Sequence, residues 1–150
     1  MKALFSILAI LTTTLSLQHC SPSNKALQLE KEALELLAQD YISWTKTGDP
    51  KLGQAIFADQ VDMTYELDNG TFEAYGFQEY KTNIDDRARS IERDMNLEQI
   101  EESEENYVIS ISDKAPDNDH SLIHLLTLKK IQDKWVIIKL SIEDGSTPLK

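Results

Sequence analysis

The chain has 150 residues, a formal net charge of −11 at neutral pH and a sequence pI near 4.6. This acidic excess repels phosphate backbones and anionic lipid headgroups, so it argues against nucleic acid as a partner. The length supports one domain with one hydrophobic core. Cys20 is the only cysteine, which excludes an internal disulfide and a zinc–thiolate site.

The first twenty residues predict export. Met1 and Lys2 lead into an uncharged, mostly apolar run over residues 3–17. That pattern is typical of a secretory signal, here residues 1–20, and is too short for a committed membrane span. Leu17-Gln18-His19-Cys20 resembles the lipobox of bacterial lipoproteins, which would place a lipid anchor on Cys20. The alternative is ordinary cleavage after Ser23. Export then leads to the periplasm, to the outer membrane as a lipoprotein, or to the medium, with membrane contact only through Cys20.

The next segment predicts helices. Residues 24–46 carry apolar side chains at helical spacing, on one stripe: Leu27, Leu34, Leu37, Tyr41 and Trp44. Gly48 suits the left-handed residue after a helix, and Asp49-Pro50 suits the start of a second helix that ends near Phe57. The spacing of apolar residues over 77–89 predicts a third helix.

The remainder predicts strands. Asp68-Asn69-Gly70 is a tight-turn signal between residues 61–67 and 71–77, so a short hairpin is expected there. Four strands follow, at 91–100, 107–112, 122–128 and 135–142, with a loop over 113–120 and a frayed tail at 144–150. The acidic run Glu98–Glu105 is interpreted as a solvated turn rather than a cation site. Helices followed by a meander predict an α+β fold, with three N-terminal helices packed on a curved antiparallel sheet.

The helical segment also carries a family resemblance. Tyr41–Asp49 runs without a gap into Pro50–Asp59 and resembles the opening of nuclear transport factor 2-like domains, which include SnoaL-like proteins and ketosteroid isomerases. The resemblance implies a cone-shaped domain over residues 24–143 with a pocket between helices and sheet.

The resemblance assigns candidate site residues. Tyr41 matches the isomerase tyrosine that stabilises an oxyanion, and His124 falls where that family carries a second oxyanion donor. Tyr65 stands where the general-base carboxylate should be, and a neutral tyrosine does not take a proton from carbon near neutral pH. Tyr41, Trp44, Tyr65 and His124 are therefore the expected ligand-binding residues. No cofactor or metal is expected, because His120 and His124 would lie about 13 Å apart on a strand.

Three functions remain open at this stage. The first is binding of a small, mostly apolar ligand with one or two polar groups. The second is a lyase or isomerase in which His124 transfers a proton with help from Tyr41, and the third is a protein-docking module. Against all site assignments stands the reading of His124 and Trp44 as ordinary core residues. Both faces of the strands at 122–128 and 135–142 are apolar, which predicts that the second face is covered by a homodimer through the sheet; the alternative is partial cover by the C-terminal segment.

Overall fold

The computed structural model describes residues 24–86, 92–114 and 121–145. The predicted signal segment, Cys20 and the last five residues lie outside this part. Helices come first and strands follow, as predicted, and the helices are α1 (Asn24–Thr47), α2 (Pro50–Ile56) and α3 (Phe77–Asp85). The strands are β1 (Phe57–Glu66), β2 (Phe72–Ala74), β3 (Asp94–Ser103), β4 (Asn106–Lys114), β5 (Ser121–Ile131) and β6 (Lys134–Asp144).

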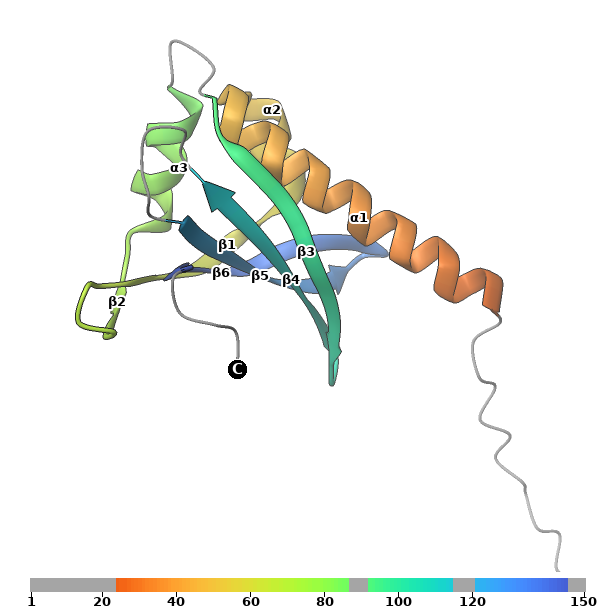
Figure 1. The fold of residues 1–150 in the computed structure, drawn as a ribbon. Coiled ribbons are helices and arrows are strands. Elements are labelled where there is room, and N and C mark those ends of the chain that lie inside the picture. The colour runs from red at the N-terminus through yellow and green to blue at the C-terminus, as the bar shows by residue number, and fades with distance from the viewer. Residues whose placement is uncertain (1–23, 87–91, 115–120, 146–150) are drawn as a thin grey trace, which may run out of the picture.

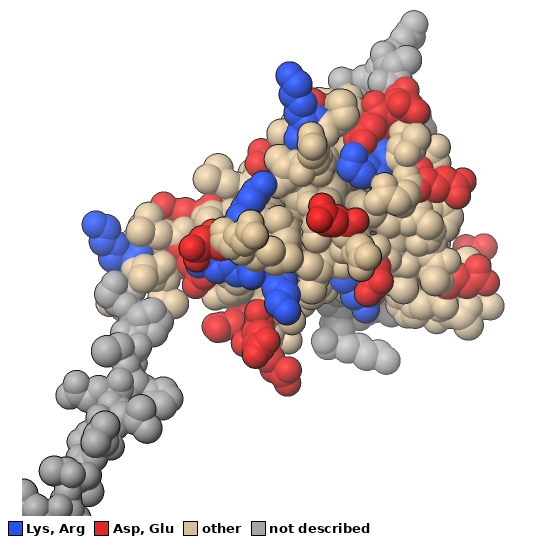
Figure 2. Space-filling view, turned by 180° about the vertical axis from the view of Figure 1, so that it is seen from behind, with Lys and Arg blue, Asp and Glu red and all other residues tan. Residues whose placement is uncertain are grey.

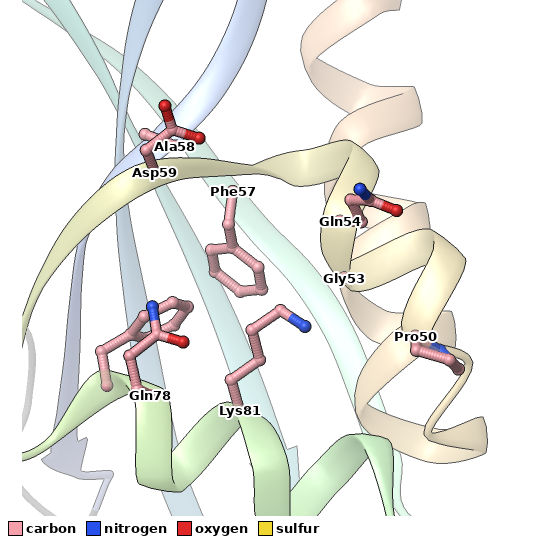
Figure 3. Close-up of a pocket in the computed structure, with 9 residues that line it drawn as sticks. Pro50, Gly53, Gln54, Phe57, Ala58, Asp59, Gln78 and Lys81 are labelled. Carbon is pink, nitrogen blue, oxygen red and sulfur yellow. The ribbon is translucent and has the colours of Figure 1, made fainter.

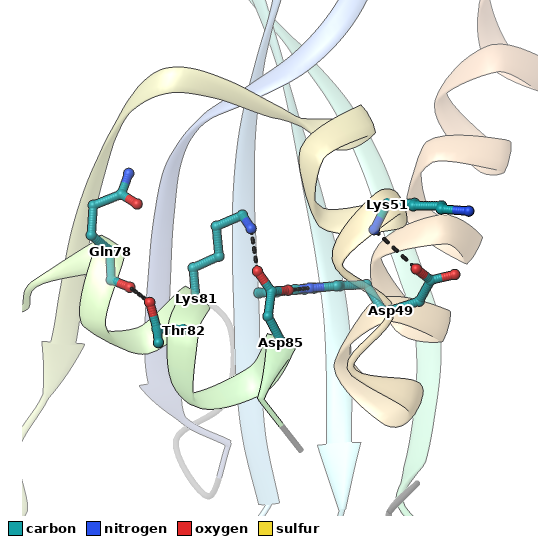
Figure 4. Close-up of polar contacts among 7 residues, drawn as sticks. Asp49, Lys51, Gln78, Lys81, Thr82 and Asp85 are labelled. Atoms are coloured by element: carbon teal, nitrogen blue, oxygen red, sulfur yellow. Dashed lines mark hydrogen bonds and ion pairs between the residues drawn. The ribbon is translucent and has the colours of Figure 1, made fainter. Parts of the chain in front are cut away.

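The junction between α1 and α2 forms where the sequence predicts it. Gly48 has a φ of 69°, and its N–H donates to the Trp44 carbonyl over 2.8 Å, which closes the last turn of α1. The Asp49 carboxylate accepts from the Lys51 backbone N–H at 2.9 Å and so caps α2 (Figure 4). Together these contacts set the angle at which α2 leaves α1.

The six strands form one curved sheet in the order β2-β1-β6-β5-β4-β3 (Figure 1). Strands β3 to β6 are the predicted antiparallel meander. The expectation of an entirely antiparallel sheet needs correction, because β1 pairs with β6 in parallel. Two neighbouring strands must run antiparallel only where a short turn joins them. Most of the domain lies between β1 and β6 in the chain, so these two strands can pair in parallel.

Three further boundaries differ from the sequence prediction. Strand β1 begins at Phe57, directly after α2, rather than at residue 61. Strand β3 continues to Ser103, so the acidic run is mostly strand, and its five glutamates are all exposed. Strand β4 continues through Asp113, which pairs with Leu122 and is not in a loop. Tertiary pairing extended each strand beyond the residues whose local pattern identified it.

The core lies between the helices and the inner face of the sheet. Helix α1 crosses that face and packs on β3 and β6, while α2 and α3 close one end (Figure 1). The wholly buried side chains of the core include Trp44, Tyr41, Leu126, Leu128 and Ile137. Seen from behind, acidic side chains are spread over the surface with lysines and arginines between them, rather than gathered in one patch (Figure 2).

Candidate functional site

The structure brings two of the predicted site residues into direct contact. Tyr41, on α1, places its hydroxyl 2.7 Å from Nδ1 of His124, on β5. Tyr41 is 0% exposed and His124 is 2% exposed. The apolar stripe of α1 buries Tyr41, and the alternation of side chains along β5 turns His124 inward. The two side chains therefore meet in the core.

Asp113 and Arg93 extend this contact into a longer row. Nε2 of His124 lies 3.1 Å from Oδ2 of Asp113, which is also buried. The Arg93 guanidinium binds the same carboxylate through two nitrogens: Nε is 2.6 Å from Oδ1 and Nη2 is 2.6 Å from Oδ2. Such a bidentate pair is a strong, charge-assisted contact. We call the row Tyr41–His124–Asp113–Arg93 the buried polar chain.

The environment shifts the pKa of two members of the buried polar chain. Burial raises the pKa of Tyr41 well above its ordinary value, and the neighbouring Tyr80 raises it further through charge and a hydrogen bond. Burial also opposes ionisation of Asp113. The close contact with His124 and the positive charge of Arg93 outweigh it, so the pKa of Asp113 lies below its ordinary value.

Asp113 and Arg93 were absent from the predicted site. Asp113 was placed in a loop because the apolar alternation of β4 ends at Ile111. The alternation of side chains along the strand was nevertheless informative, because Ile109, Ile111 and Asp113 lie on one face of the sheet. Strand pairing sets Met95 opposite Asp113, and Arg93 lies two residues before Met95, just ahead of the start of β3. An acid and a base continuing a buried face are the signal that could have identified both.

Tyr65, the third predicted residue, lies in a separate but neighbouring hollow. It lines a cavity of about 370 Å³ between α3 and the β1–β2 hairpin. We call this cavity the tyrosine hollow, and its lining is Met63, Tyr65, Leu67, Glu73, Tyr75 and Tyr80. Tyr65 and His124 both pair with Ile142, so they occupy one transverse row of the sheet, two strands apart. The hollow therefore lies beside the buried polar chain.

Tyr80 connects the two. It lines the tyrosine hollow from α3 and lies close enough to Tyr41 to raise the pKa of the Tyr41 hydroxyl. The Trp44 ring lies between them, with ring centroids 5.8 Å from Tyr41 and 6.1 Å from Tyr80.

Trp44, the fourth predicted residue, has a packing environment. It is 0% exposed, and its indole N–H donates to Oδ1 of Asp85 at 2.7 Å. Lys81 holds the other oxygen of Asp85 (Figure 4). A Cβ on Gly53 would sit 2.7 Å from the indole nitrogen, so glycine is required for this close approach. Trp44 therefore anchors α1 to α2 and α3.

A second hollow, of about 410 Å³, lies between α2, α3 and the start of β1. We call it the glutamine hollow, after Gln54 and Gln78 in its lining. Figure 3 shows Lys81 rising from α3 toward α2 below the ring of Phe57. A third, of about 470 Å³, is a shallow surface between α1 and Leu97 of β3. Neither Tyr41 nor His124 lines any of these three.

Two kinds of feature are absent from the described ranges. Within residues 24–86, 92–114 and 121–145, no three histidine, cysteine, aspartate or glutamate residues are grouped so as to hold a metal ion. No helix in the same ranges has the length and apolar character needed to cross a membrane. The candidate sites in this part of the chain are the buried polar chain and the hollows described above.

The fold is shared with solved structures. An NTF2-like protein of unknown function from Shewanella baltica OS155 superposes with a TM-score of 0.66 at 15% identity, covering 81% of this chain and 97% of that one. One from Silicibacter pomeroyi DSS-3 gives 0.64 at 12% identity, covering 79% and 98%. A protein of unknown function with a cystatin-like fold, from Nostoc punctiforme PCC 73102, gives 0.55 at 20% identity, covering 81% and 96%.

Sequence comparison adds the family. No curated protein matches the chain. A family model described as "Putative lumazine-binding" matches residues 29–141, which span α1 to β6. The chain therefore belongs to that family and has the nuclear transport factor 2-like fold.

Proposed function

We propose that the domain binds a small, flat heteroaromatic ligand of the lumazine type in the tyrosine hollow. The observation that carries the proposal is the lining: three tyrosines, two apolar side chains and the single carboxylate of Glu73 around about 370 Å³. This volume falls within the range of small-molecule sites. The family description supports the same ligand class.

The chemistry of the lining suits such a ligand. Lumazine is a planar heteroaromatic ring system with N–H donors and carbonyl acceptors on its edge. Tyrosine rings offer stacking faces, and their hydroxyls both donate and accept. Tyr65 and Tyr75 are 37% and 46% exposed, so they are open to a ligand, whereas Tyr80 lies deeper, against Tyr41.

Calorimetric titration of the purified protein with lumazine tests the proposal. Tyr65→Ala and Tyr75→Ala should each weaken binding about tenfold, since stacked aromatic contacts contribute roughly 1–1.5 kcal/mol. Phe72→Ala is the matched control, because Phe72 is an exposed aromatic on the same hairpin that does not line the tyrosine hollow. Equal losses in all three variants, or no binding to the wild type, would contradict the proposal.

Proton-transfer chemistry is the second candidate, and one observation favours it. Asp113 gives His124 a carboxylate partner, which a histidine base needs for orientation. The burial of His124 weighs against it, because a substrate would have to act through Tyr41 and Tyr80. Androst-5-ene-3,17-dione is a suitable probe of carbon-acid chemistry. Isomerisation that depends on His124 would favour an enzyme, and lumazine binding without isomerisation would favour the binding domain.

Export with a lipid anchor is also proposed, on the pattern of residues 1–20 alone. Metabolic labelling with palmitate in a bacterial host tests it. Label on the wild type that is absent from Cys20→Ser establishes lipidation. A mature N-terminus at Asn24 without label would instead establish cleavage after Ser23.

A further inference from the structure

The tyrosine hollow is built mainly on one face of the β1–β2 hairpin. Met63 and Tyr65 alternate along β1, and Leu67 continues the alternation one residue beyond it, so these side chains share a face. Glu73 on β2 is the register partner of Tyr65. The Tyr75 N–H extends the pairing, because it donates to the Met63 carbonyl over 2.9 Å. The hairpin therefore presents Tyr65, Glu73 and Tyr75 to the hollow side by side.

Glu73 gives the lining a fixed hydrogen-bonding polarity. The hydroxyls of Tyr65 and Tyr75 can donate or accept, so they suit either kind of group on a ligand. Glu73 is exposed, and at neutral pH an exposed glutamate is ionised, so both of its oxygens only accept. The six lining residues include no lysine, arginine or histidine that would neutralise this charge. A ligand must therefore turn hydrogen-bond donors toward Glu73.

The hairpin register places this carboxylate at the edge of a stacked ring. Residues directly opposite each other on antiparallel strands have Cβ atoms about 5 Å apart. Glu73 stands opposite Tyr65 in this way and precedes Tyr75 by two residues on the same face. A flat ring system that stacks on either tyrosine has its rim beside Glu73. The carboxylate is therefore positioned to read the polar edge of the ring rather than its face.

We infer that Glu73 makes the tyrosine hollow select flat heteroaromatic ligands with two adjacent N–H groups on one edge, such as a 2-amino-4-oxopteridine. This inference rests on the proposed function, since it names the ligand class that the same hollow prefers. Two parallel N–H groups bind one carboxylate through a bidentate, charge-assisted pair. Lumazine has a carbonyl in place of the amino group. Only one N–H of that edge would bond to Glu73, and a carbonyl oxygen would face the second carboxylate oxygen.

A matched pair of probes tests the selection. Pterin, which is 2-amino-4-oxopteridine, shares the ring system and one carbonyl with lumazine and differs in the amino group. In calorimetric titrations of the full chain at about pH 6.5, where glutamate is ionised, the wild type should bind pterin about tenfold more tightly. Glu73→Gln should bring the two affinities to within about twofold. Its carboxamide offers one acceptor and one donor, and it can pair with the adjacent carbonyl and N–H that both probes carry.

Two controls separate the contact from general charge and from folding. Glu79→Gln removes the same charge from an exposed residue of α3 that does not line the tyrosine hollow, so it should keep the preference for pterin. The probe 3-methylpterin keeps the amino group but lacks the neighbouring ring N–H. It should bind the wild type about as weakly as lumazine, and it tests the inference without any substitution.

The outcomes distinguish this inference from the proposed function. If the wild type binds lumazine as tightly as pterin, or more tightly, the inference is overturned and the proposed function stands. A preference that persists in Glu73→Gln also overturns it, as does one that Glu79→Gln removes equally, since a contact with Glu73 would then not explain the selection. If neither pterin nor lumazine binds the wild type, the proposed function and the inference fail together.

Discussion

The Tyr41 hydroxyl meets Nδ1 of His124 at 2.7 Å, although the two residues are 83 positions apart in the chain. This contact joins the C-terminal part of α1 to β5, a central strand of the sheet. Both side chains are buried, so neither group has water as an alternative partner. Its loss should therefore be measurable both in stability and in the hollow beside it.

Tyr41→Phe should destabilise the domain by about 1–3 kcal/mol. The substitution keeps the ring but leaves Nδ1 of His124 buried without its hydrogen-bond partner, and an unsatisfied buried polar atom has a cost of that order. Urea denaturation followed by circular dichroism measures the change. Tyr75→Phe is the control, because Tyr75 is 46% exposed and should stay within about 0.5 kcal/mol of the wild type. Equal stability of the two variants would show that the buried hydroxyl is unimportant.

Asp113→Asn should destabilise the domain at pH 7, because it removes the charge that Arg93 holds with two nitrogens. The pKa of Asp113 is lower folded than unfolded, so its ionised form stabilises the native state above the ordinary carboxyl value of 3.8. That contribution is lost as the pH falls below 3.8 and through the lower native pKa. The stability difference between wild type and Asp113→Asn should shrink over this range.

Denaturation curves at pH 7, 5, 4 and 3 (roughly spanning the carboxyl range) measure this. Asp94→Asn serves as the control, since Asp94 is exposed on the neighbouring strand and its removal should change the free energy of unfolding little at any of these values. A difference for Asp113→Asn that stays constant down to pH 3 would refute the linkage.

Gly53→Ala should destabilise the domain by about 1–3 kcal/mol, because the added methyl would lie 2.7 Å from Nε1 of Trp44 and displace the indole from Asp85. Emission from the indole should shift to longer wavelength as its surroundings loosen. Gly76→Ala is the matched control. The nearest atom to a Cβ at that position is 3.7 Å away, so the substitution should change the free energy of unfolding little. If both glycines tolerate alanine equally, the close approach to Trp44 does not constrain this position.

A homodimer through the outer face of the sheet remains a proposal, and Leu125→Lys tests it. Leu125 sits on that face between Ser110 and Ser141, its partners on the two neighbouring strands. A lysine there should raise the dimer dissociation constant at least tenfold in sedimentation equilibrium. Lys129→Glu, a charge change at an exposed position of the same strand, should have a smaller effect. A monomeric wild type would end the proposal.

The sequence predicted the helices and the meander because their signals are local. The stripe of α1, the glycine at its end and the Asn-Gly turn each act within a few residues. The contact of Tyr41 with His124 followed only from the family resemblance, since no local pattern links α1 to β5.

The parts that escaped prediction depend on pairing between distant segments. Asp113 became part of β4 because β3 and β5 both extend alongside it. The order of the segments along the chain does not indicate that β1 pairs with β6, or that the two strands run parallel. The tyrosine hollow arises where α3 and a hairpin approach each other, which periodicity alone does not encode.

The position of β1 between β2 and β6 has a consequence for biosynthesis. Strand β1 is the first strand made and β6 the last, so the β1–β2 arm has no sheet to join until nearly the whole chain is available. Pairings between such distant segments form late, because they close the longest loops. A ribosome-bound chain that lacks Lys134–Asp144 therefore leaves Met63 and Tyr65 without their partner strand, and the tyrosine hollow forms only after the C-terminal strand is released.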